Sequence, residues 1–494
     1  MRSSSRLRSV EEYLYLHATN TPDKVALVVG ERQISYRSLY EKAYRYHEAL
    51  KASGVSAGDI VVTRADQTPD YVVIYLAIHM AGGIVTSLEK NIPLAELEKI
   101  ASRLGASFVI PKENEVPAGP WKNLVSPSQV PSGEDYPALP SLEFPDPEAS
   151  ADILFTTGTT GASKGVELSH KALVATAENL IFGCEYKPDT FLIVPGPLNH
   201  ANAIRKLLAT LVNGSTLCLL PGMSDLPGFF RALDHPLGRK ACCLPPAAIR
   251  TLFALTGDRL GAYSGKIDFI ESASAPLPES DKERLRRLLP DARLYNNYGS
   301  SEAASVCMVD YNRYPDKKDC IGKEMPNSRV IIVDDAHREI PSDPAHPGFL
   351  ACLGDVIMKG YVRDPALTQE VLVNGAVYTS DIGYKDAEGF LFITGRKGDV
   401  INVGGIKVSP VEVEEAALAF EGVEDCICIA RPDPITGQAL KLLLVLRPGI
   451  SPDFRLIGQF LSARLEAVKV PRFYEQVEKI ERTYNGKPDR KFYR

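Results

Sequence analysis

The sequence has little of what marks several common protein classes. Its 56 lysines and arginines are outnumbered by 62 aspartates and glutamates, and the net charge of −6 argues against a nucleic-acid partner. It has no C-x-x-C pair, and the closest of its nine cysteines are Cys242–Cys243 and Cys426 with Cys428. Such pairs do not supply a closed metal site. We therefore expect small buried thiols in a reducing compartment.

Long uninterrupted apolar runs are also scarce. Residues 71–88 carry no formal charge, and their length is about the minimum for crossing a bilayer. However, Gly82-Gly83 divides them into an apolar helix, Tyr71–Ala81, and a β-branched strand, Ile84–Ser87. We predict a helix–strand unit and no membrane span. The basic start of the chain leads into no apolar segment, so we expect no signal peptide and a cytoplasmic protein.

What is present indicates an ordinary globular protein of two to four domains, with 45% hydrophobic and 24% charged residues among 494. The first hundred residues alternate strand-like and helix-like segments, which is typical of βαβ units and a mainly parallel sheet. The proline-rich residues 111–147 predict a long surface connection. Residues 322–392 are rich in strand patterns. After Arg396 the pattern predicts a small α+β domain.

The strongest local signal is the segment from Ile153 to Gly165, Ile-Leu-Phe-Thr-Thr-Gly-Thr-Thr-Gly-Ala-Ser-Lys-Gly. A predicted strand leads into a loop of glycines, threonine hydroxyls and one lysine. Glycines let backbone N–H groups approach an anion, and the hydroxyls and Lys164 add further donors. The segment is not the P-loop of NTPases, because Gly165 stands where that motif needs a hydroxyl for magnesium. The loop therefore predicts phosphate binding of another kind.

The order of these residues matches [ST]-[ST]-G-[ST]-T-G-x-x-K-G and resembles the signature of the adenylate-forming superfamily. This superfamily contains acyl- and aryl-CoA ligases, synthetase adenylation domains and luciferases, and further motifs extend the resemblance over most of the chain. It implies an α/β fold of two domains: an AMP-binding N-terminal domain (1–397) and a small mobile α+β lid (398–494). Gly398 stands where the family usually has an aspartate or lysine as its hinge.

The resemblance also implies which residues bind ATP. Tyr298-Gly299-Ser-Ser301-Glu302 resembles Y-G-x-[ST]-E, in which the ring stacks on adenine, the hydroxyl meets the α-phosphate and the glutamate binds Mg²⁺. Asp381 and Arg396 resemble the family's ribose contacts. The implied phosphate loop and adenine contacts are Thr156, Thr157, Gly158, Thr159, Thr160, Gly161 and Lys164, and Ser274, Ala275, Pro276, Asn296 and Asn297.

Three further motifs resemble the parts that bind the acid and the thiol. Lys487, in T-x-x-G-K, corresponds to the lysine that contacts both the carboxylate and the α-phosphate and offsets their repulsion. His200, in P-x-x-H, corresponds to a residue at the mouth of the acyl pocket. Gly404 and Gly405 resemble the loop beside the pantetheine thiol. The F-D motif of domains that take α-amino acids is absent.

The function that the resemblance implies is that of an AMP-forming carboxylic acid–CoA ligase that uses ATP and Mg²⁺. One alternative is a stand-alone enzyme that loads the phosphopantetheine of an acyl or peptidyl carrier protein, and another is an inactive nucleotide-binding relative. Ala201 and Ala203 leave room for a bulky aryl or alkyl acid. Arg205 either recognises a second polar group of the acid or, as we expect, lies at the surface.

Overall fold

A computed structural model describes residues 7, 9–113, 115–131, 136–156, 164–399, 401–403, 406–447, 449–450, 453–482, 488–490 and 492–493. The α-helices in these ranges are α1 (Val10–Asn20), α2 (Tyr36–Ala52), α3 (Pro69–Met80), α4 (Leu94–Leu104), α5 (His170–Gly183), α6 (Ala201–Asn213), α7 (Leu226–Asp234), α8 (Pro246–Thr256), α9 (Glu279–Leu288), α10 (Pro365–Val371), α11 (Pro410–Leu418) and α12 (Phe454–Ser462).

The first strands are β1 (Val25–Val29), β2 (Arg32–Ser35), β3 (Ile60–Arg64), β4 (Ile84–Leu88), β5 (Phe108–Val109), β6 (Lys122–Asn123), β7 (Ser150–Thr156), β8 (Lys164–Ser169), β9 (Thr190–Val194), β10 (Thr216–Leu219), β11 (Arg239–Cys243), β12 (Ile267–Ser272) and β13 (Arg293–Ser300). The later strands are β14 (Ala304–Asp310), β15 (Cys320–Glu324), β16 (Ser328–Val333), β17 (Gly348–Gly354), β18 (Gly360–Tyr361), β19 (Leu372–Val373), β20 (Ala376–Lys385), β21 (Leu391–Arg396), β22 (Ile401–Val403), β23 (Ile406–Val408), β24 (Val423–Asp433), β25 (Gly437–Leu446) and β26 (Phe473–Gln476).

Two large sheets form the N-terminal part of the molecule. One runs β16-β17-β20-β21-β15-β14-β13-β12-β11-β9-β10-β1-β2, and the other runs β18-β8-β7-β4-β3-β5-β6. The neighbours from β13 through β12, β11, β9 and β10 to β1 are parallel, as are β7, β4, β3, β5 and β6. The predicted parallel sheet is therefore confirmed in both, and antiparallel strands extend each of them.

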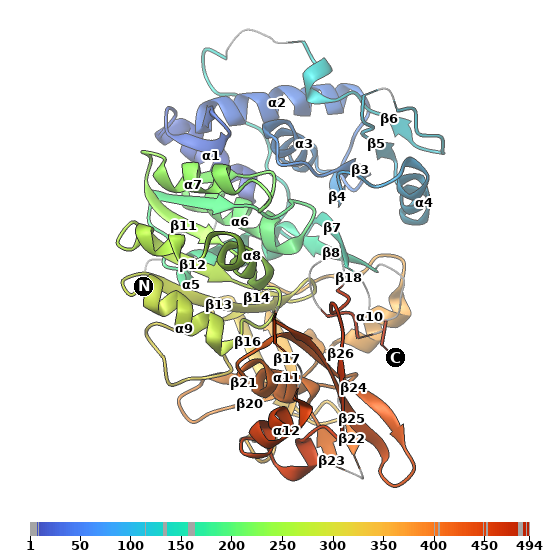
Figure 1. Cartoon of the computed structure of the whole chain (residues 1–494). Coiled ribbons are helices and arrows are strands. Elements are labelled where there is room, and N and C mark those ends of the chain that lie inside the picture. The colour runs from blue at the N-terminus through green and yellow to red at the C-terminus, as the bar shows by residue number, and fades with distance from the viewer. Residues whose placement is uncertain are drawn as a thin grey trace.

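Most helices of the N-terminal part form two sets, which pack against opposite faces of the larger sheet. One core joins side chains of both sheets with α1, α2, α3, α5 and α6, which lie between the sheets. A second core joins the opposite face of the larger sheet to α7, α8 and α9. Figure 1 shows the orange and red elements α11, α12 and β23 at the end of the molecule opposite α2. The structure is thus a large α/β domain followed by a small C-terminal domain.

Local sequence signals set several of these boundaries. Hydroxyls of Ser35, Thr68 and Ser169 accept bonds from the first turns of α2, α3 and α5, which satisfies amides that lack partners within the helix. Gly105 and Gly214 end α4 and α6 with positive φ angles of 62° and 71°.

The apolar run after Tyr71 forms the predicted helix and strand, α3 and β4. Among the described residues, no helix is long and apolar enough to span a bilayer. All nine cysteines are buried and unpaired, as expected. The prediction for residues 111–147 is only partly right, because β6 adds to the smaller sheet and Trp121 and Leu124 are buried beside it.

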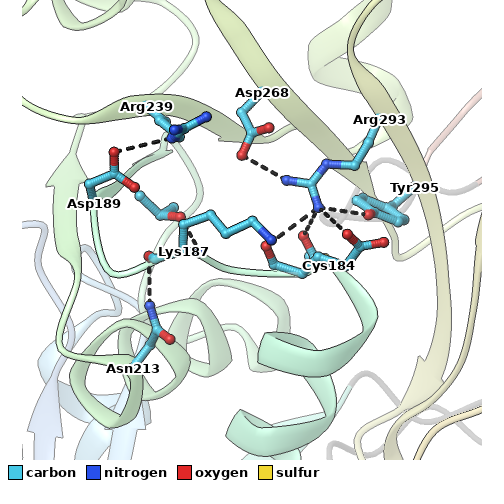
Figure 2. Close-up of polar contacts among 10 residues, drawn as sticks. Cys184, Lys187, Asp189, Asn213, Arg239, Asp268, Arg293 and Tyr295 are labelled. Atoms are coloured by element: carbon cyan, nitrogen blue, oxygen red, sulfur yellow. Dashed lines mark hydrogen bonds and ion pairs between the residues drawn. The ribbon is translucent and has the colours of Figure 1, made fainter.

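The amino ends of the parallel strands are tied together by a charged network, shown in Figure 2. Arg293, the first residue of β13, donates to Asp268 at 2.7 Å and to the carbonyl of Cys184 at 3.0 Å. Arg239, at the start of β11, donates to Asp189 at 3.1 Å. These contacts fix the segment between α5 and β9 to the sheet. The carboxyl ends of the same strands remain available for a site, which is where α/β sheets usually place one.

The small C-terminal domain has its own core, in which β22, β24 and β25 pack against α11 and α12. Arg490 ties the end of the chain to it by donating to Glu414 at 2.7 Å and to the carbonyl of Cys428 at 2.9 Å. A Cβ atom at Gly398 would meet nothing within 4 Å, and its φ lies outside the left-handed region. The described conformation does not require glycine at position 398. The role of Gly398 as the hinge between the two domains therefore remains a prediction.

A buried charged cluster joins α1, α3 and β7. The ring nitrogens of His79 lie 2.9 Å from Glu11 and 3.0 Å from Asp152, and all three side chains are at most 1% exposed. Burial alone would lower the pKa of His79, but the two carboxylates raise it to about 10. His170 also lies near Glu11, so that a metal ion could be considered. Because both nitrogens of His79 face carboxylates, we interpret the cluster as a structural ion pair.

We expect His79→Gln to lower stability most at mildly acidic pH. A folded-state pKa above the ordinary 6.5 contributes stability that is complete below pH 6.5 and is lost as pH rises towards 10. Breaking a buried pair costs about 3–5 kcal/mol. Thermal unfolding of both proteins at pH 6 and pH 9.5 measures the effect. The difference in unfolding midpoint between the wild type and His79→Gln should be smaller at pH 9.5 than at pH 6. An equal difference at both pH values would contradict a charged His79.

Candidate functional site

The predicted site residues gather where strands of the larger sheet end. The segment carrying His200 follows β9, the turn Ser274–Pro276 follows β12, and Tyr298 to Glu302 span the end of β13 and the turn into β14. The strands β20 and β21 bring Asp381 and Arg396 to the same region from the antiparallel half of the sheet. The sheet therefore unites motifs that lie up to 200 residues apart in the sequence.

Tyr298, Asp381 and Arg396 form one group. The Tyr298 hydroxyl donates to Asp381 Oδ2 at 2.6 Å, and Arg396 Nε lies 3.6 Å from Asp381 Oδ1. Asp381 and Arg396 face each other directly across β20 and β21. Burial, with the neighbouring Asp381 carboxylate, raises the pKa of Tyr298 well above its ordinary value, so its hydroxyl stays protonated and donates. The group presents an aromatic ring beside a carboxylate and a guanidinium.

Glu302 lies in a second group, with Tyr361 and Lys164. The Tyr361 hydroxyl donates to Glu302 Oε1 at 2.8 Å, and the ammonium of Lys164 lies 5.4 Å from the centre of the Tyr361 ring. The Glu302 carbonyl accepts from the Met358 amide at 2.7 Å. The pairing of β18 with β8 places Tyr361 opposite Val166, two residues after Lys164. The carboxylate is thus oriented next to the segment that carries the predicted phosphate loop.

Gly299 is required by the close approach of β13 and β14. A Cβ atom there would lie 1.7 Å from the carbonyl oxygen of Ala304, so no other residue fits without moving the backbone. Ala304 itself has a φ of 53°, which is uncommon for a residue with a side chain. This tight turn sets the positions of Ser301 and Glu302.

The expectation that both Asn296 and Asn297 reach the adenine is corrected. Successive strand residues point to opposite faces, so the two side chains diverge. Asn297 is 7% exposed, and its amide donates to Glu271 at 2.8 Å and to Ser305 at 3.1 Å on the face covered by α6. Asn296 donates to the carbonyl of Cys320 at 3.5 Å. Only Asn296 lies on the face away from α6.

Ser274, Ala275 and Pro276 form the turn that follows β12. Ser274 is exposed and has a φ of 78°, a left-handed conformation that favours glycine. This conformation agrees with the glycine- or alanine-rich character of the motif that the segment resembles.

His200 is half-buried and occupies the residue directly before α6. Burial lowers the pKa of its imidazole, which keeps the ring neutral near pH 7. Ala201 is half-buried and Ala203 is buried in the turn that follows.

Arg205 is buried, contrary to the expectation that it lies at the surface. It is 6% exposed, and its guanidinium donates to the carbonyls of Ser300 and Ser301 at 2.9 and 3.2 Å. Burial lowers the pKa of Arg205 to about 10, which leaves it charged at neutral pH beside Glu302. The arginine therefore supports the turn that carries Glu302.

We expect Arg205→Met to raise the KM for ATP and slow adenylation by about tenfold, because two partly buried backbone carbonyls lose their donor. Arg205→Lys, which cannot form the same fork, should give a smaller effect. Initial rates measured at varied ATP and at varied acid concentrations distinguish a role of Arg205 in supporting the turn from a role in recognising the acid. An effect confined to the KM for the acid would instead make Arg205 part of acid recognition.

Several predicted residues lie outside the described ranges. These are the loop residues Thr157, Gly158, Thr159, Thr160 and Gly161, the pair Gly404 and Gly405, and Lys487. Thr156 ends β7, the strand that leads into the loop, and Lys164 begins β8.

Sequence reasoning missed Tyr361 and misjudged the position of Arg205. Tyr361 belongs to no recognised motif, and only the pairing of β18 with β8 brings it to Glu302. Arg205 stood out as a charge in an apolar stretch, but its partners are backbone carbonyls about 95 residues away in the sequence, which no local pattern reveals.

Comparisons with known proteins agree with this geometry. Residues 14–362 match the model of the AMP-binding enzyme family, and residues 412–487 match that of the AMP-binding enzyme C-terminal domain. The chain is 26% identical to a long-chain-fatty-acid–CoA ligase of Bacillus subtilis (strain 168), over 97% of the chain and 93% of the relative. It is 25% identical to the fatty acid–[acyl-carrier-protein] ligase ScoC of Streptomyces coeruleorubidus, over 98% and 95%.

The fold is likewise shared with solved structures. The ATP-bound structure of MatB from Rhodopseudomonas palustris superposes with a TM-score of 0.88 at 23% identity and covers 98% of both chains. The family model that matches most of the N-terminal domain decides the assignment: the chain belongs to the AMP-binding enzymes of the adenylate-forming superfamily.

Proposed function

We propose that this AMP-forming acid–thiol ligase activates a small carboxylic acid with ATP and transfers the acyl group to coenzyme A. The observation that carries the proposal is that the short segment Tyr298–Glu302 of the larger sheet has one group at each end, and that the second group includes residues of β8 and β18 in the smaller sheet. Tyr298, Asp381 and Arg396 suit a nucleoside, while Glu302, Tyr361 and Lys164 suit phosphates and their metal ion.

The first group would hold the nucleoside of ATP. Asp381 is a carboxylate that ribose hydroxyls can donate to, and Arg396 keeps it in place from the facing strand. The ring of Tyr298 would stack on the adenine, with the turn Ser274–Pro276 and Asn296 at its edge. The Tyr298 hydroxyl fixes the ring by its bond to Asp381.

The second group would hold the phosphates. Mg²⁺ is usually bound through one or two carboxylates and the substrate's phosphate oxygens, and Glu302 is a carboxylate held in one orientation by the Tyr361 hydroxyl. The residues present therefore fit Mg²⁺, which when bound would neutralise phosphate charge. Lys164, the loop hydroxyls and Ser301 would donate to the phosphate oxygens.

Two covalent steps would follow. A carboxylate oxygen attacks the α-phosphorus, the bond to the β-phosphate oxygen breaks, and acyl-AMP and pyrophosphate form. A thiol sulfur then attacks the acyl carbon, its proton passes to solvent, and AMP leaves. Lys487 would lie between the two anions of the first step and offset their repulsion. His200 would border the acid, and Gly404 and Gly405 the incoming thiol.

The two steps would need different positions of the C-terminal domain. We place the division between the domains at residues 397 and 398, with Gly398 as the hinge. In the described arrangement α11 contacts the N-terminal domain, where burial and the neighbouring Asp319 carboxyl raise the pKa of Glu415 to about 8. Ionisation of both acids would weaken this contact, so the arrangement should be less populated above pH 8.

The second candidate is transfer to the phosphopantetheine of a carrier protein, which the similarity to a fatty acid–[acyl-carrier-protein] ligase favours. ATP–pyrophosphate exchange with a panel of acids tests activation, and thioester formation with CoA or with a carrier protein tests the acceptor. Thioester formation only with the carrier protein would replace our first proposal by the second. No exchange with any acid would indicate an inactive relative.

A further inference from the structure

Two acidic side chains from different domains are hydrogen-bonded to each other where the C-terminal domain contacts the N-terminal domain. Glu415 on α11 is half-buried, and Asp319, which directly precedes β15, is exposed at the rim of the contact. The carboxyl of Glu415 donates to the carboxylate of Asp319. Beside them, α11 lies against β21. We call these two side chains the Glu415–Asp319 pair.

The charges around the Glu415–Asp319 pair, among the described residues, leave one proton between its two carboxyls. Lys282 on α9 faces the pair, but its ammonium is bound to Glu279 at 2.6 Å, and Glu279 adds a negative charge of its own. Lys318 is exposed, the hydroxyl of Tyr384 on β20 is neutral, and Arg396 at the end of β21 faces a different carboxylate. Two carboxyls in contact cannot both ionise at low cost, so they share a proton.

The backbone at Asp319 also distinguishes this contact. Its φ of 57° lies in the left-handed region, which is uncommon for a residue with a side chain. Such conformations persist where the surrounding structure fixes them, and they are frequent at switches. Burial and the neighbouring carboxyl raise the pKa of Asp319 as well as that of Glu415. The pair therefore retains a proton that either carboxyl would lose in water at neutral pH.

The described arrangement of the domains suits the first of the two proposed steps. Arg490 lies three residues after Lys487, and its Nε is 3.7 Å from Asp399 Oδ2. The Asp399 amide donates to the carbonyl of Arg396 at 3.0 Å, so this segment lies beside the group that would hold the nucleoside. The residues that follow Lys487 are thus held where acyl-AMP would form.

We propose that the Glu415–Asp319 pair is a proton-operated latch that holds the C-terminal domain in the arrangement for acyl-AMP formation. When the shared proton passes to solvent, two negative charges are left in contact, and the domain is released for the thioester step. This inference rests on the proposed function and adds its regulation: rising pH disfavours the first step relative to the second.

The direction of the effect follows from the number of bound protons. Glu415 has an ordinary pKa of 4.5, and in the described arrangement its pKa is about 8. Between these values the described arrangement binds one more proton than the released one, so its share falls as pH rises through this window. One proton changes the ratio of the two arrangements by at most about tenfold per pH unit, and the ratio levels off above about pH 9.

The test measures the position of the C-terminal domain in the full chain. All nine native cysteines are buried, so fluorescent dyes can be attached at two introduced ones, Ala254→Cys on α8 and Ala463→Cys after α12, both at exposed positions. Energy transfer gives the ratio of the two arrangements at pH 6, 7, 8 and 9. We expect this ratio to fall by about tenfold from pH 6 to pH 7 and to level off towards pH 9.

Asp319→Asn, made in the labelled chain, removes the need for the proton and keeps the contact. Its amide can donate to the ionised Glu415 carboxylate, and asparagine tolerates a left-handed backbone. We expect the ratio of arrangements to be nearly constant from pH 6 to pH 9, and the described arrangement to exceed that of the wild type at pH 9. Glu415→Gln should have the same effect. Glu283→Gln, at an exposed residue of α9, is the matched control and should follow the wild type.

The two half-reactions provide a second readout at the same pH values. ATP–pyrophosphate exchange measures the first step, and thioester formation from supplied acyl-AMP measures the second. In the wild type the ratio of exchange to thioester formation should fall as pH rises, and in Asp319→Asn it should fall much less. The attacking thiol ionises alike with both proteins, so comparing them removes its contribution.

The outcomes separate the latch from the proposed function. Thermal midpoints identify the variants that are folded. If energy transfer in the wild type does not change from pH 6 to pH 9, or if a folded amide variant keeps the wild-type response, the inference is wrong. A pH response of energy transfer without exchange on any acid contradicts the proposed function and supports the latch. Exchange without a pH-dependent arrangement leaves the ligase intact and removes only the latch.

Discussion

Lys487→Ala should reduce the rate of acyl-AMP formation by on the order of 10²–10³ and leave thioester formation from supplied acyl-AMP largely unchanged. The carboxylate and the α-phosphate are both anionic, and a point cation between them lowers their repulsion as the new bond forms. In the second step the α-phosphate is already joined to the acyl group in a mixed anhydride, and no anionic carboxylate attacks it. We therefore expect Lys487 to matter for the first step only.

The two half-reactions are measured separately, by pyrophosphate exchange and by thioester yield from synthetic acyl-AMP. The matched control is Lys479→Ala, because Lys479 is an exposed lysine whose ammonium pairs with Glu481 at 2.7 Å. This control should retain both half-reactions. If Lys487→Ala slows them equally, the lysine does not have the role that we propose.

Glu302→Gln should slow adenylation by on the order of 10²-fold and raise the Mg²⁺ concentration needed for half-maximal rate. The change keeps the shape of the side chain but removes the charge that a hard cation requires. Tyr361→Phe provides a graded comparison, since it removes the donor 2.8 Å from Glu302 Oε1 and keeps the carboxylate. We expect Tyr361→Phe to raise the Mg²⁺ concentration needed for half-maximal rate by only a few-fold.

Magnesium titrations of the exchange reaction measure both variants. Glu339→Gln, at an exposed glutamate beside Arg329, is the control and should titrate as the wild type does. An unchanged titration for Glu302→Gln would place the metal ion on other ligands.

Much of the fold could be predicted from the sequence because the strongest signals are local. The helix predicted over Tyr71–Ala81 and the strand predicted over Ile84–Ser87 correspond to α3 (Pro69–Met80) and β4 (Ile84–Leu88), because Gly82-Gly83 separates the two apolar segments clearly. The helix α6 was harder to identify, because buried Arg205 and Lys206 interrupt its apolar pattern. Their burial depends on partners in β12 and β13, which only the folded sheet brings near.

The candidate site was likewise predictable only where its residues stand in local motifs. Tyr298, Glu302, Asp381 and Arg396 stand in contiguous motifs, and the sheet brings them into two adjacent groups. Asn297 was misplaced because a motif gives sequence order, whereas the pleat of β13 decides which face each side chain takes. The contribution of Tyr361 depends on the pairing of β18 with β8, two short segments almost 200 residues apart.

The most direct test of acid activation through an adenylate follows the oxygens of the acid itself. The preferred acid, labelled with ¹⁸O at both carboxylate oxygens, is incubated with the full chain, ATP, Mg²⁺ and CoA. Mass spectrometry then measures the label in AMP, pyrophosphate and the thioester.

If a carboxylate oxygen attacks the α-phosphorus, that oxygen stays on phosphorus when the thiol displaces AMP. We therefore predict AMP carrying one ¹⁸O, unlabelled pyrophosphate, and a thioester that keeps the other ¹⁸O. Unlabelled AMP, or label in inorganic phosphate or pyrophosphate, would contradict activation through acyl-AMP.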